Sequence, residues 1–336
     1  IVPGHKPTLR LHGRLVELNT GVLTVGFVRD GLESLCDEEK LQEFARVKNI
    51  DFALEHAGDQ GRQRFRANYF VVGERMGACF RVIPRSIPDF SWAGFPFPVA
   101  DRLAHFRNGL VLITGVTGAG KTTSLAMIIN LLNQEGGYRI ITAEDPIEYI
   151  FPATANSIVT QREVGQDISS FADGLKYGLR QDPDVILVGE IRDQETAQMA
   201  LSAAETGHLV FSTLHTRDAK GAVSRFTDLF RPATQPEVRA QLAMALRAVV
   251  SQHLLPSIIK SAKRELALEV MFTNSPIASS IRFGKIESID NCILTGRAAG
   301  MITLDESTRR LLVDDRIDRQ TAERFVNDVT ALDRRR

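Results

Sequence analysis

The stretch from Gly109 to Thr123 constrains the fold of this chain more than any other part of its sequence. It consists of Gly-Leu-Val-Leu-Ile-Thr-Gly-Val-Thr-Gly-Ala-Gly-Lys-Thr-Thr. The apolar run 110–113 predicts a buried parallel strand, and apolar residues at helical spacing between 125 and 132 predict a helix after it. Between them, residues 115–122 match the phosphate-loop pattern G-x-x-x-x-G-K-[ST]. A strand, a glycine loop and a helix in this order predict a nucleotide-binding site.

Each part of this loop has a chemical reason to hold a nucleotide. Its glycines let the backbone turn tightly enough to direct N–H groups at a phosphate, and the helix N-terminus adds positive partial charge. Lys121 would reach the β- and γ-phosphates of ATP, and the hydroxyl group of Thr122 would bind Mg²⁺. We therefore expect ATP and Mg²⁺ as cofactors. The predicted nucleotide-binding residues of the loop are Gly115, Val116, Thr117, Gly118, Ala119, Gly120, Lys121, Thr122 and Thr123.

Length and composition limit the remaining possibilities. A chain of 336 residues is too long for one typical core, so about two domains are expected. Lysine plus arginine equals aspartate plus glutamate at 41 each, so no overall basic field would draw the chain to nucleic acid, and we expect no direct contact with it. The three cysteines lack the paired spacing of a zinc module and indicate a reducing compartment. No apolar run reaches the ~18 residues that a membrane span needs, and no signal peptide is visible.

The sequence divides into three parts. Residues 1–84 predict a first domain, with two short strands joined at His12–Gly13, a helix over 37–48 and strands between 52 and 70. Residues 85–107 contain prolines 88, 96 and 98 and predict a semi-rigid linker. Residues 108–336 alternate strands and helices, which predicts an α/β domain with a mostly parallel sheet and a mainly helical part beyond residue 256. The chain begins at Ile1 rather than at methionine, and we expect its natural N-terminus to be trimmed.

Several elements of the α/β domain can be placed in advance. Strands are predicted at 110–114, 138–143, 185–189, 208–214 and 265–272, and helices at 121–134, 169–181, 194–205, 219–230 and 236–254. In the helix 169–181, Gly174 and Gly178 share one face, although each glycine costs about 1 kcal/mol relative to alanine. This face indicates the close approach of a neighbouring element.

Two acidic residues stand where predicted parallel strands end. Glu190 follows the buried run 185–188 and Gly189, and Glu144 follows the strand before it. Ligands of such sheets bind at the carboxyl ends of the strands, so both carboxylates could face the same γ-phosphate. One would orient the attacking water and the other would complete the Mg²⁺ site with Thr122. The sequence leaves open which of Glu144 and Glu190 has which role.

Two histidines bracket the predicted strand 208–214. His215 lies at its carboxyl end, on the same edge as Glu190, which favours contact with the γ-phosphate. His208 lies at its amino end, where a hydrogen-bonded structural histidine and a nucleotide-binding one are both open readings. The seven histidines have no metal-ligand spacing, which argues against a zinc site.

Taken together, four motifs resemble those of the secretion-superfamily ATPases that drive type II secretion and type IV pili. They are the phosphate loop 115–122, the acidic box 144–148, the Glu190 segment 189–193 and the histidine box 208–215. Within that superfamily the chain is most similar to the type IV pilus retraction ATPases of twitching motility. The resemblance runs from about residue 7 to residue 318. The extension and type II secretion members are longer and usually carry a four-cysteine zinc element that this sequence lacks.

The resemblance implies a RecA-like P-loop ATPase core, a smaller PAS-like α+β N-terminal domain and a homohexamer. In such rings, arginines of the N-terminal domain approach the ATP of a neighbouring subunit, and Phe65-Arg66 and Phe80-Arg81 match their positions. The alternative for Arg66 and Arg81 is an ordinary solvated arginine face. The histidine box also implies nucleotide contact for His208.

The resemblance also implies a motor that turns ATP hydrolysis into domain rotation and powers pilus retraction. It would act in the cytoplasm, peripherally at the inner membrane, with a membrane platform protein and the pilus machinery as partners. The alternatives are a related motor for type II or type IV secretion, DNA uptake or conjugation, a nucleic-acid translocase, and a nucleotide-binding regulator without turnover. Neutral net charge counts against the translocase, and the presence of Lys121, Glu144 and Glu190 counts against the regulator.

Overall fold

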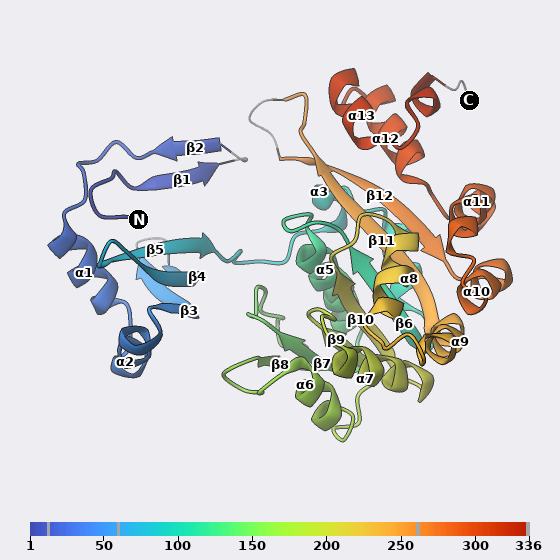
Figure 1. Ribbon diagram of the computed structural model, residues 1–336, viewed down its shortest axis with the longest axis horizontal. Helices are drawn as coiled ribbons and strands as arrows, with labels where there is room; N and C mark the ends of the chain where they lie inside the picture. The colour runs from blue at the N-terminus through green and yellow to red at the C-terminus, as the bar shows by residue number, and fades with distance from the viewer. Residues whose placement is uncertain (12–13, 59–60, 260–262, 334–336) are drawn as a thin grey trace. The chain divides into compact units, whose positions relative to one another are not determined.

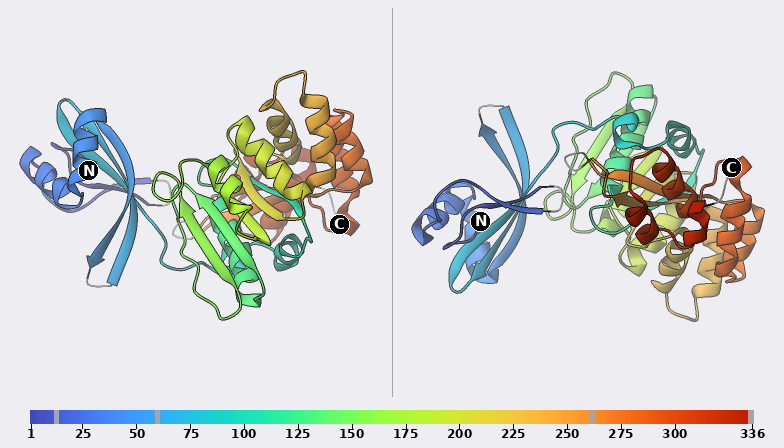
Figure 2. Two further views of the ribbon diagram at one scale, coloured as in Figure 1. Left: turned by 90° about the horizontal axis from the view of Figure 1, so that it is seen from below. Right: turned by 90° about the horizontal axis from the view of Figure 1, so that it is seen from above.

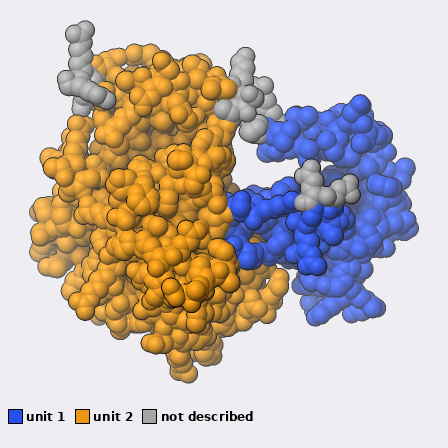
Figure 3. All heavy atoms as spheres, turned by 180° about the vertical axis from the view of Figure 1, so that it is seen from behind, with its two compact units in different colours: residues 1–86, 148–150 blue, residues 87–147, 151–336 orange. Residues whose placement is uncertain are grey.

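A computed structural model describes residues 1–11, 14–58, 61–259 and 263–333 of the chain. It divides into two compact units (Figure 3). Unit 1 comprises residues 1–86 and 148–150, and unit 2 comprises residues 87–147 and 151–336. Among the described residues, no helix is both long and apolar enough to cross a membrane.

Unit 1 is an α+β unit built on a three-stranded antiparallel sheet in the order β3-β4-β5. Buried residues of helix α1 and of these strands form its core, where the hydroxyl group of Tyr69 donates to the carbonyl of Leu32 at 3.0 Å. The predicted junction at His12–Gly13 lies outside the described residues, and a PAS-like classification stays a prediction. The elements are β1 (Thr8–Leu11), β2 (Arg14–Glu17), α1 (Val25–Ser34), α2 (Glu38–Val47), β3 (Asn49–Gly58), β4 (Gly61–Val72) and β5 (Arg75–Val82).

Unit 2 is organised around a seven-stranded sheet in the order β12-β11-β6-β10-β9-β7-β8 (Figures 1 and 2). All its neighbouring strands run parallel except β11 and β12. Every residue of β6 is buried, as expected for a central parallel strand covered on both faces. The strands are β6 (Gly109–Thr114), β7 (Arg139–Glu144), β8 (Ile158–Glu163), β9 (Val185–Val188), β10 (Leu209–Leu214), β11 (Leu246–Leu255) and β12 (Glu265–Phe272).

Helices connect the parallel strands of this sheet. They are α5 (Lys121–Glu135), α6 (Phe171–Gly178), α7 (Gln194–Glu205), α8 (Ala219–Asp228) and α9 (Gln235–Ala245). On α6, a Cβ atom added at Gly174 would lie 2.9 Å from the Cβ of Ala143, and one added at Gly178 would lie 3.5 Å from Ile141. Both contacts belong to β7, so the predicted close approach at the two glycines is confirmed.

Two segments differ from their sequence prediction. The helix predicted over 236–254 ends at Ala245, and residues 246–255 form strand β11 between β6 and β12. No glycine or proline marks this change, and burial on both faces removes the alternation that identifies a strand. Strand β8, at the opposite edge of the sheet, was not predicted.

The proline-rich segment 85–107 also differs from the predicted linker. It contains α3 (Phe90–Ala93) and α4 (Phe97–Ala104), and from Ile87 onward it belongs to unit 2. The prolines do not prevent α4, because Pro96 is its N-cap and Pro98 lies in its first turn, where no hydrogen bond from their nitrogen is needed. Ala100, Leu103 and Ala104 of α4 are buried.

Beyond β12 the chain is helical, as predicted. The α-helices are α10 (Ser275–Arg282), α11 (Ile289–Thr295), α12 (Leu304–Val313) and α13 (Arg319–Phe325). Short 3₁₀ turns occur at Ile286–Ser288, Arg297–Ala299 and Val329–Asp333. Apolar residues of α12, α13 and the last 3₁₀ turn form a separate small core with Leu255 and Ala267 of the sheet.

Candidate nucleotide-binding site

The predicted phosphate loop joins the carboxyl end of β6 to the first residue of α5. Gly115, Gly118 and Gly120 have φ values of 144°, 77° and 89°, which side chains rarely permit. A Cβ atom at Gly115 would lie 2.5 Å from the carbonyl oxygen of Gln252 on β11. The glycines therefore permit both the shape of the loop and its close packing on the neighbouring strand.

Lys121 begins α5 inside this loop, and its side chain is nearly enclosed, with 8% of the residue exposed. Its ammonium group donates to the carbonyl oxygens of Gly115 at 2.8 Å and Val116 at 3.3 Å. A cation at a helix N-terminus lined by free N–H groups suits an anion. The residues of the loop therefore fit the phosphates of a nucleotide.

Strand β11 supports the loop from behind, which the sequence analysis missed. Gln252 donates from Nε2 to the Ser124 hydroxyl at 2.8 Å, and Thr114 donates to the Ser251 hydroxyl at 2.8 Å. From the residue just before β12, the Arg264 guanidinium donates to the carbonyl of Gly118 at 3.0 Å. The polar pair Ser251-Gln252, directly after the apolar run 248–250, is the signal that could have identified this support.

Glu190 and His215 meet at the carboxyl edge of the sheet. His215 Nε2 lies 3.2 Å from Glu190 Oε2, and Arg192 Nη2 lies 2.5 Å from Oε1 of the same carboxylate. Only 12% of the Glu190 side chain is exposed. The hydroxyl of Thr213 donates to the Gly189 carbonyl at 2.7 Å, which ties the Glu190 segment to β10. The structure thus brings together the two residues that the sequence placed at one edge.

Glu144 ends β7, at the same edge and one strand beyond β9. Its Oε1 accepts from the Thr142 hydroxyl at 2.6 Å and from Gln161 Nε2 at 3.0 Å, and the residue is buried. These two donors fix the direction in which the Glu144 carboxyl group points.

The predicted magnesium ligands have suitable chemistry, because a hydroxyl group and carboxylates are the oxygen donors that Mg²⁺ prefers. Among the described residues, three His, Cys, Asp or Glu side chains approach one another closely enough to share an ion only at Asp101, His105 and Glu135, which are all exposed. A metal at the loop would therefore take most of its ligands from phosphate oxygens and water, as Mg²⁺ usually does.

His208 does not join the phosphate loop within this chain. It precedes β10, whose register with β6 pairs Leu209 with Gly109 and Leu214 with Thr114. At about 3.3 Å per residue, the six residues of β10 separate it by about 20 Å from the loop edge. Its Nδ1 instead lies 3.0 Å from the carbonyl of Ala203 at the end of α7. Of the two roles that the sequence left open for His208, this contact is the one expected of a hydrogen-bonded structural histidine.

The two predicted arginines face each other in unit 1. Arg66 of β4 and Arg81 of β5 are direct partners in the antiparallel register, so they share one face of the sheet. Arg66 has an ion pair of 3.7 Å with Asp51. Like charges directly opposite each other destabilise a sheet, and an anion between them would offset this cost.

Comparison with known proteins decides the family. The model of the type II/IV secretion system protein family matches residues 97–328. The chain is also 37% identical to the twitching motility protein of Neisseria gonorrhoeae, over 95% of this chain and 83% of that one. The chain belongs to the type II/IV secretion system protein family. It is thus a secretion-type ATPase.

Other members of this family agree in sequence and in fold. The type IV pilus retraction ATPase PilT of Pseudomonas aeruginosa is 37% identical over 95% of this chain and 91% of its own length. A crystal structure of the pilus retraction motor PilT with bound ADP superposes with a TM-score of 0.87, at 38% identity, over 99% of this chain and 94% of that chain. The predicted α/β ATPase core and the use of a nucleotide are confirmed.

Proposed function

We propose that this chain is the subunit of a homohexameric motor that hydrolyses ATP and powers retraction of the type IV pilus. The observation that carries the proposal is the complete phosphate loop with Glu190 and His215 at one sheet edge, in a chain similar to the PilT motors over nearly its whole length. The loop would bind ATP and the edge residues would act on its γ-phosphate.

The side chains of the site would divide the work as follows. Lys121 sits inside the loop, where its charge would stabilise the β- and γ-phosphates as negative charge moves during transfer. The Glu190 carboxylate would orient the attacking water and accept its proton, with His215 and Arg192 fixing the direction in which it points. Bound Mg²⁺ would supply charge stabilisation on the phosphates, held by Thr122 with Glu190 or Glu144.

Glu190 is favoured over Glu144 as the water-orienting residue. In the sheet order, β10 and β9 separate β7 from the loop strand β6, so Glu144 is three strands from β6 and Glu190 is two. At about 4.8 Å per strand, this places Glu144 about 5 Å farther along the edge. The Thr142 and Gln161 donors then suit Glu144 to orient groups around the metal.

The hexamer follows from the arginines of unit 1. Arg66 and Arg81 form a like-charged cross-strand pair, and they match the positions from which retraction ATPases reach a neighbour's nucleotide. We infer that each subunit supplies these arginines to the ATP of the next subunit. Such an arrangement couples the position of unit 1 to the state of the neighbouring nucleotide.

The partners and location follow from the same proposal. A motor of pilus retraction acts in the cytoplasm, at the inner membrane, on a platform protein of the pilus machinery. The neutral net charge of the chain gives no support to a nucleic-acid substrate.

Deletion of the gene tests the proposed function. A deletion strain should lose twitching motility and carry more and longer surface pili, as counted by electron microscopy. The wild-type chain should restore motility, and a Lys121→Ala chain should not. Normal twitching with a defect in secretion or DNA uptake would instead favour the related motors named above.

A further inference from the structure

A cavity of about 930 Å³ lies in the helical part of unit 2, away from the phosphate loop. It is bounded by β12, α11, α12 and the chain after α13, so no residue of the loop contributes to it. Its lining contains six carboxylates and three guanidinium groups: Glu269, Asp290, Asp305, Glu306, Asp314 and Asp328, with Arg297, Arg309 and Arg310. A cavity of this size and polarity is large enough for several side chains of a partner.

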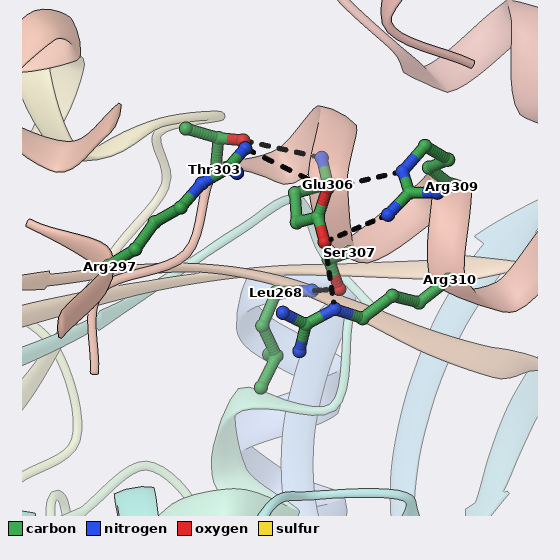
Figure 4. A network of polar contacts seen from close by, with 7 residues as sticks. All are labelled: Leu268, Arg297, Thr303, Glu306, Ser307, Arg309 and Arg310. Carbon is green, nitrogen blue, oxygen red and sulfur yellow. Dashed lines mark hydrogen bonds and ion pairs between the residues drawn. The ribbon is translucent and has the colours of Figure 1, made fainter. Parts of the chain in front are cut away.

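The positive charges of the cavity are gathered at one carboxylate. Arg297, Arg309 and Arg310 all form ion pairs with Glu306, at 3.8, 3.2 and 3.1 Å (Figure 4). Glu306 lies in the first turn of α12, where Thr303 caps the helix. The three arginines are therefore already paired with a carboxylate of α12, at one side of the cavity.

Glu269 lies in the wall of the same cavity without such a partner. It is 6% exposed, and its Oε1 accepts from the backbone N–H of Ala219 at 2.7 Å. No lysine or arginine of the described residues forms an ion pair with it. Asp305, on the same wall, accepts from the backbone of Asn327 and Asp328 and likewise has no ion pair among the described residues. A carboxylate as buried as that of Glu269 normally has a cation beside it when it is ionised, whereas Asp305 is only partly buried.

The raised pKa of Glu269 agrees with the lack of a lysine or arginine partner among the described residues. Burial, opposed by the hydrogen bond from the Ala219 N–H and assisted by the nearby Asp218, Asp290 and Asp305, raises the pKa of its carboxyl group to about 7. Asp290 itself pairs with Lys220 at 2.8 Å, so that lysine is already engaged.

We propose that the cavity between β12, α11 and α12 is a docking site for a basic segment of a partner protein, with an arginine or lysine side chain reaching Glu269. This proposal rests on the proposed function, because that function places the motor at the cytoplasmic face of a membrane protein. Cytoplasmic loops of membrane proteins carry an excess of lysine and arginine. The carboxylates of the cavity complement such a loop in charge.

A fluorescent peptide of about twelve residues, with arginine at alternate positions, provides the probe for this proposal. Its binding to the full-length chain is measured by fluorescence anisotropy without nucleotide, with an equally long glutamate peptide as the reference. The arginine peptide should bind and the glutamate peptide should not. Because no ATP is present, binding is independent of whether the chain hydrolyses ATP or retracts pili, so the two proposals can fail separately.

Two pairs of variants locate the binding. Glu269→Gln keeps the acceptor for Ala219 and removes only the charge, so it should weaken binding at least about tenfold. Its control Glu287→Gln removes an exposed carboxylate that contacts Lys220 outside the cavity lining, and should bind like the wild type. Leu294 lines the cavity and is partly exposed, so Leu294→Arg supplies a competing cation and should also weaken binding, whereas Leu294→Gln should not.

Equal affinity of the wild type and the Glu269→Gln and Leu294→Arg variants would overturn the proposal, as would equal binding of the glutamate peptide. Displacement of the peptide by an equimolar amount of spermidine would also overturn it, because the cavity would then be a site for small free cations. Loss of binding confined to the two cavity variants, with the controls intact, is the result expected.

Discussion

At the scale of single residues, the site depends on two charged side chains that are largely buried, those of Lys121 and Glu190. Lys121→Ala removes the buried ammonium group beside the loop carbonyls, so ATP turnover should fall by at least about 10²–10³. Lys176 of α6 lies outside the loop, and Lys176→Ala should hydrolyse ATP at the wild-type rate. Phosphate release by both purified variants checks this prediction. Turnover in the Lys121→Ala chain would remove the loop from the mechanism.

Glu190 allows a second test of the same chemistry. Glu190→Gln keeps the shape of the side chain but loses the carboxylate that would accept a proton, so hydrolysis should fall by about 10²–10⁴. The affinity for a fluorescent ATP analogue should stay within a few fold of the wild type, because Lys121 and the loop are unchanged. If binding and hydrolysis fell together, Glu190 would instead hold the nucleotide or its metal.

Glu269 permits a prediction about pH. Its folded-state pKa of about 7 lies above the ordinary value of 4.5, so the folded chain binds this proton more tightly than the unfolded chain does. The contribution of this proton to the free energy of unfolding is therefore complete below about pH 4.5 and is lost as the pH rises through about 7. At 1.36 kcal/mol per pH unit, the loss reaches about 3 kcal/mol, and Glu269→Gln should escape it. Thermal unfolding of both chains between pH 5 and pH 8, about the range of this change, should show the variant gaining stability relative to the wild type.

At the scale of elements, the two glycines of α6 give a matched pair. Alanine at Gly174 would meet the Cβ of Ala143 and the Cδ1 of Ile168 at 2.9 Å, so Gly174→Ala should destabilise the protein by about 1–3 kcal/mol. Alanine at Gly178 would meet Ile141 at an ordinary 3.5 Å, and its better helix propensity should leave stability unchanged or raise it by up to about 1 kcal/mol. The free energies of unfolding of both variants and the wild type, measured in denaturant, test this prediction. Equal effects would mean that α6 does not rest on β7 through Gly174.

The elements also show what the sequence could predict. The strand, loop and helix from Gly109 onward were predictable. The sequence there passes from an apolar run to a glycine-rich segment and then to apolar residues at helical spacing. The Glu190–His215 pair was predictable because carboxyl ends of parallel strands meet at one edge. The change from α9 to β11 was not, since Ala245 and Leu246 are apolar neighbours and no breaker separates them. The support of the loop by Gln252 depends on that same strand, so it was missed with it.

The cavity beside Glu269 was beyond sequence reasoning for another reason. Its lining comes from segments between residues 269 and 331, and nothing in the spacing of its acids brings them together. Glu269 lies in a strand whose other residues from Leu266 to Phe272 are all apolar, as in a buried core strand. Only the packing of α11 and α12 on β12 shows that this carboxylate faces a cavity and lacks an ion pair among the described residues.

At the scale of the whole molecule, the proposed ring makes each site depend on two chains. Arg66 and Arg81 belong to unit 1, whereas the loop belongs to unit 2. If the arginines serve a neighbour, Arg66→Ala should leave nucleotide binding nearly intact and lower turnover by about 10³–10⁵, the range for an arginine supplied in trans. Arg62 of the same strand pairs with Glu55 and is largely exposed, so Arg62→Ala is the matched control and should keep wild-type turnover.

Mixing of subunits separates a shared site from a folding defect. A ring that contains both Arg66→Ala and Lys121→Ala chains has interfaces where an intact loop meets an intact arginine, although neither parent ring has one. Mixing two inactive preparations should therefore restore part of the ATP turnover, most at equal proportions because such interfaces are then most frequent. Light scattering confirms that the parents and the mixture are all hexamers. A hexameric mixture as inactive as its parents would mean that Arg66 acts within its own chain or outside catalysis, and that the Arg66–Arg81 pair is an ordinary solvated face.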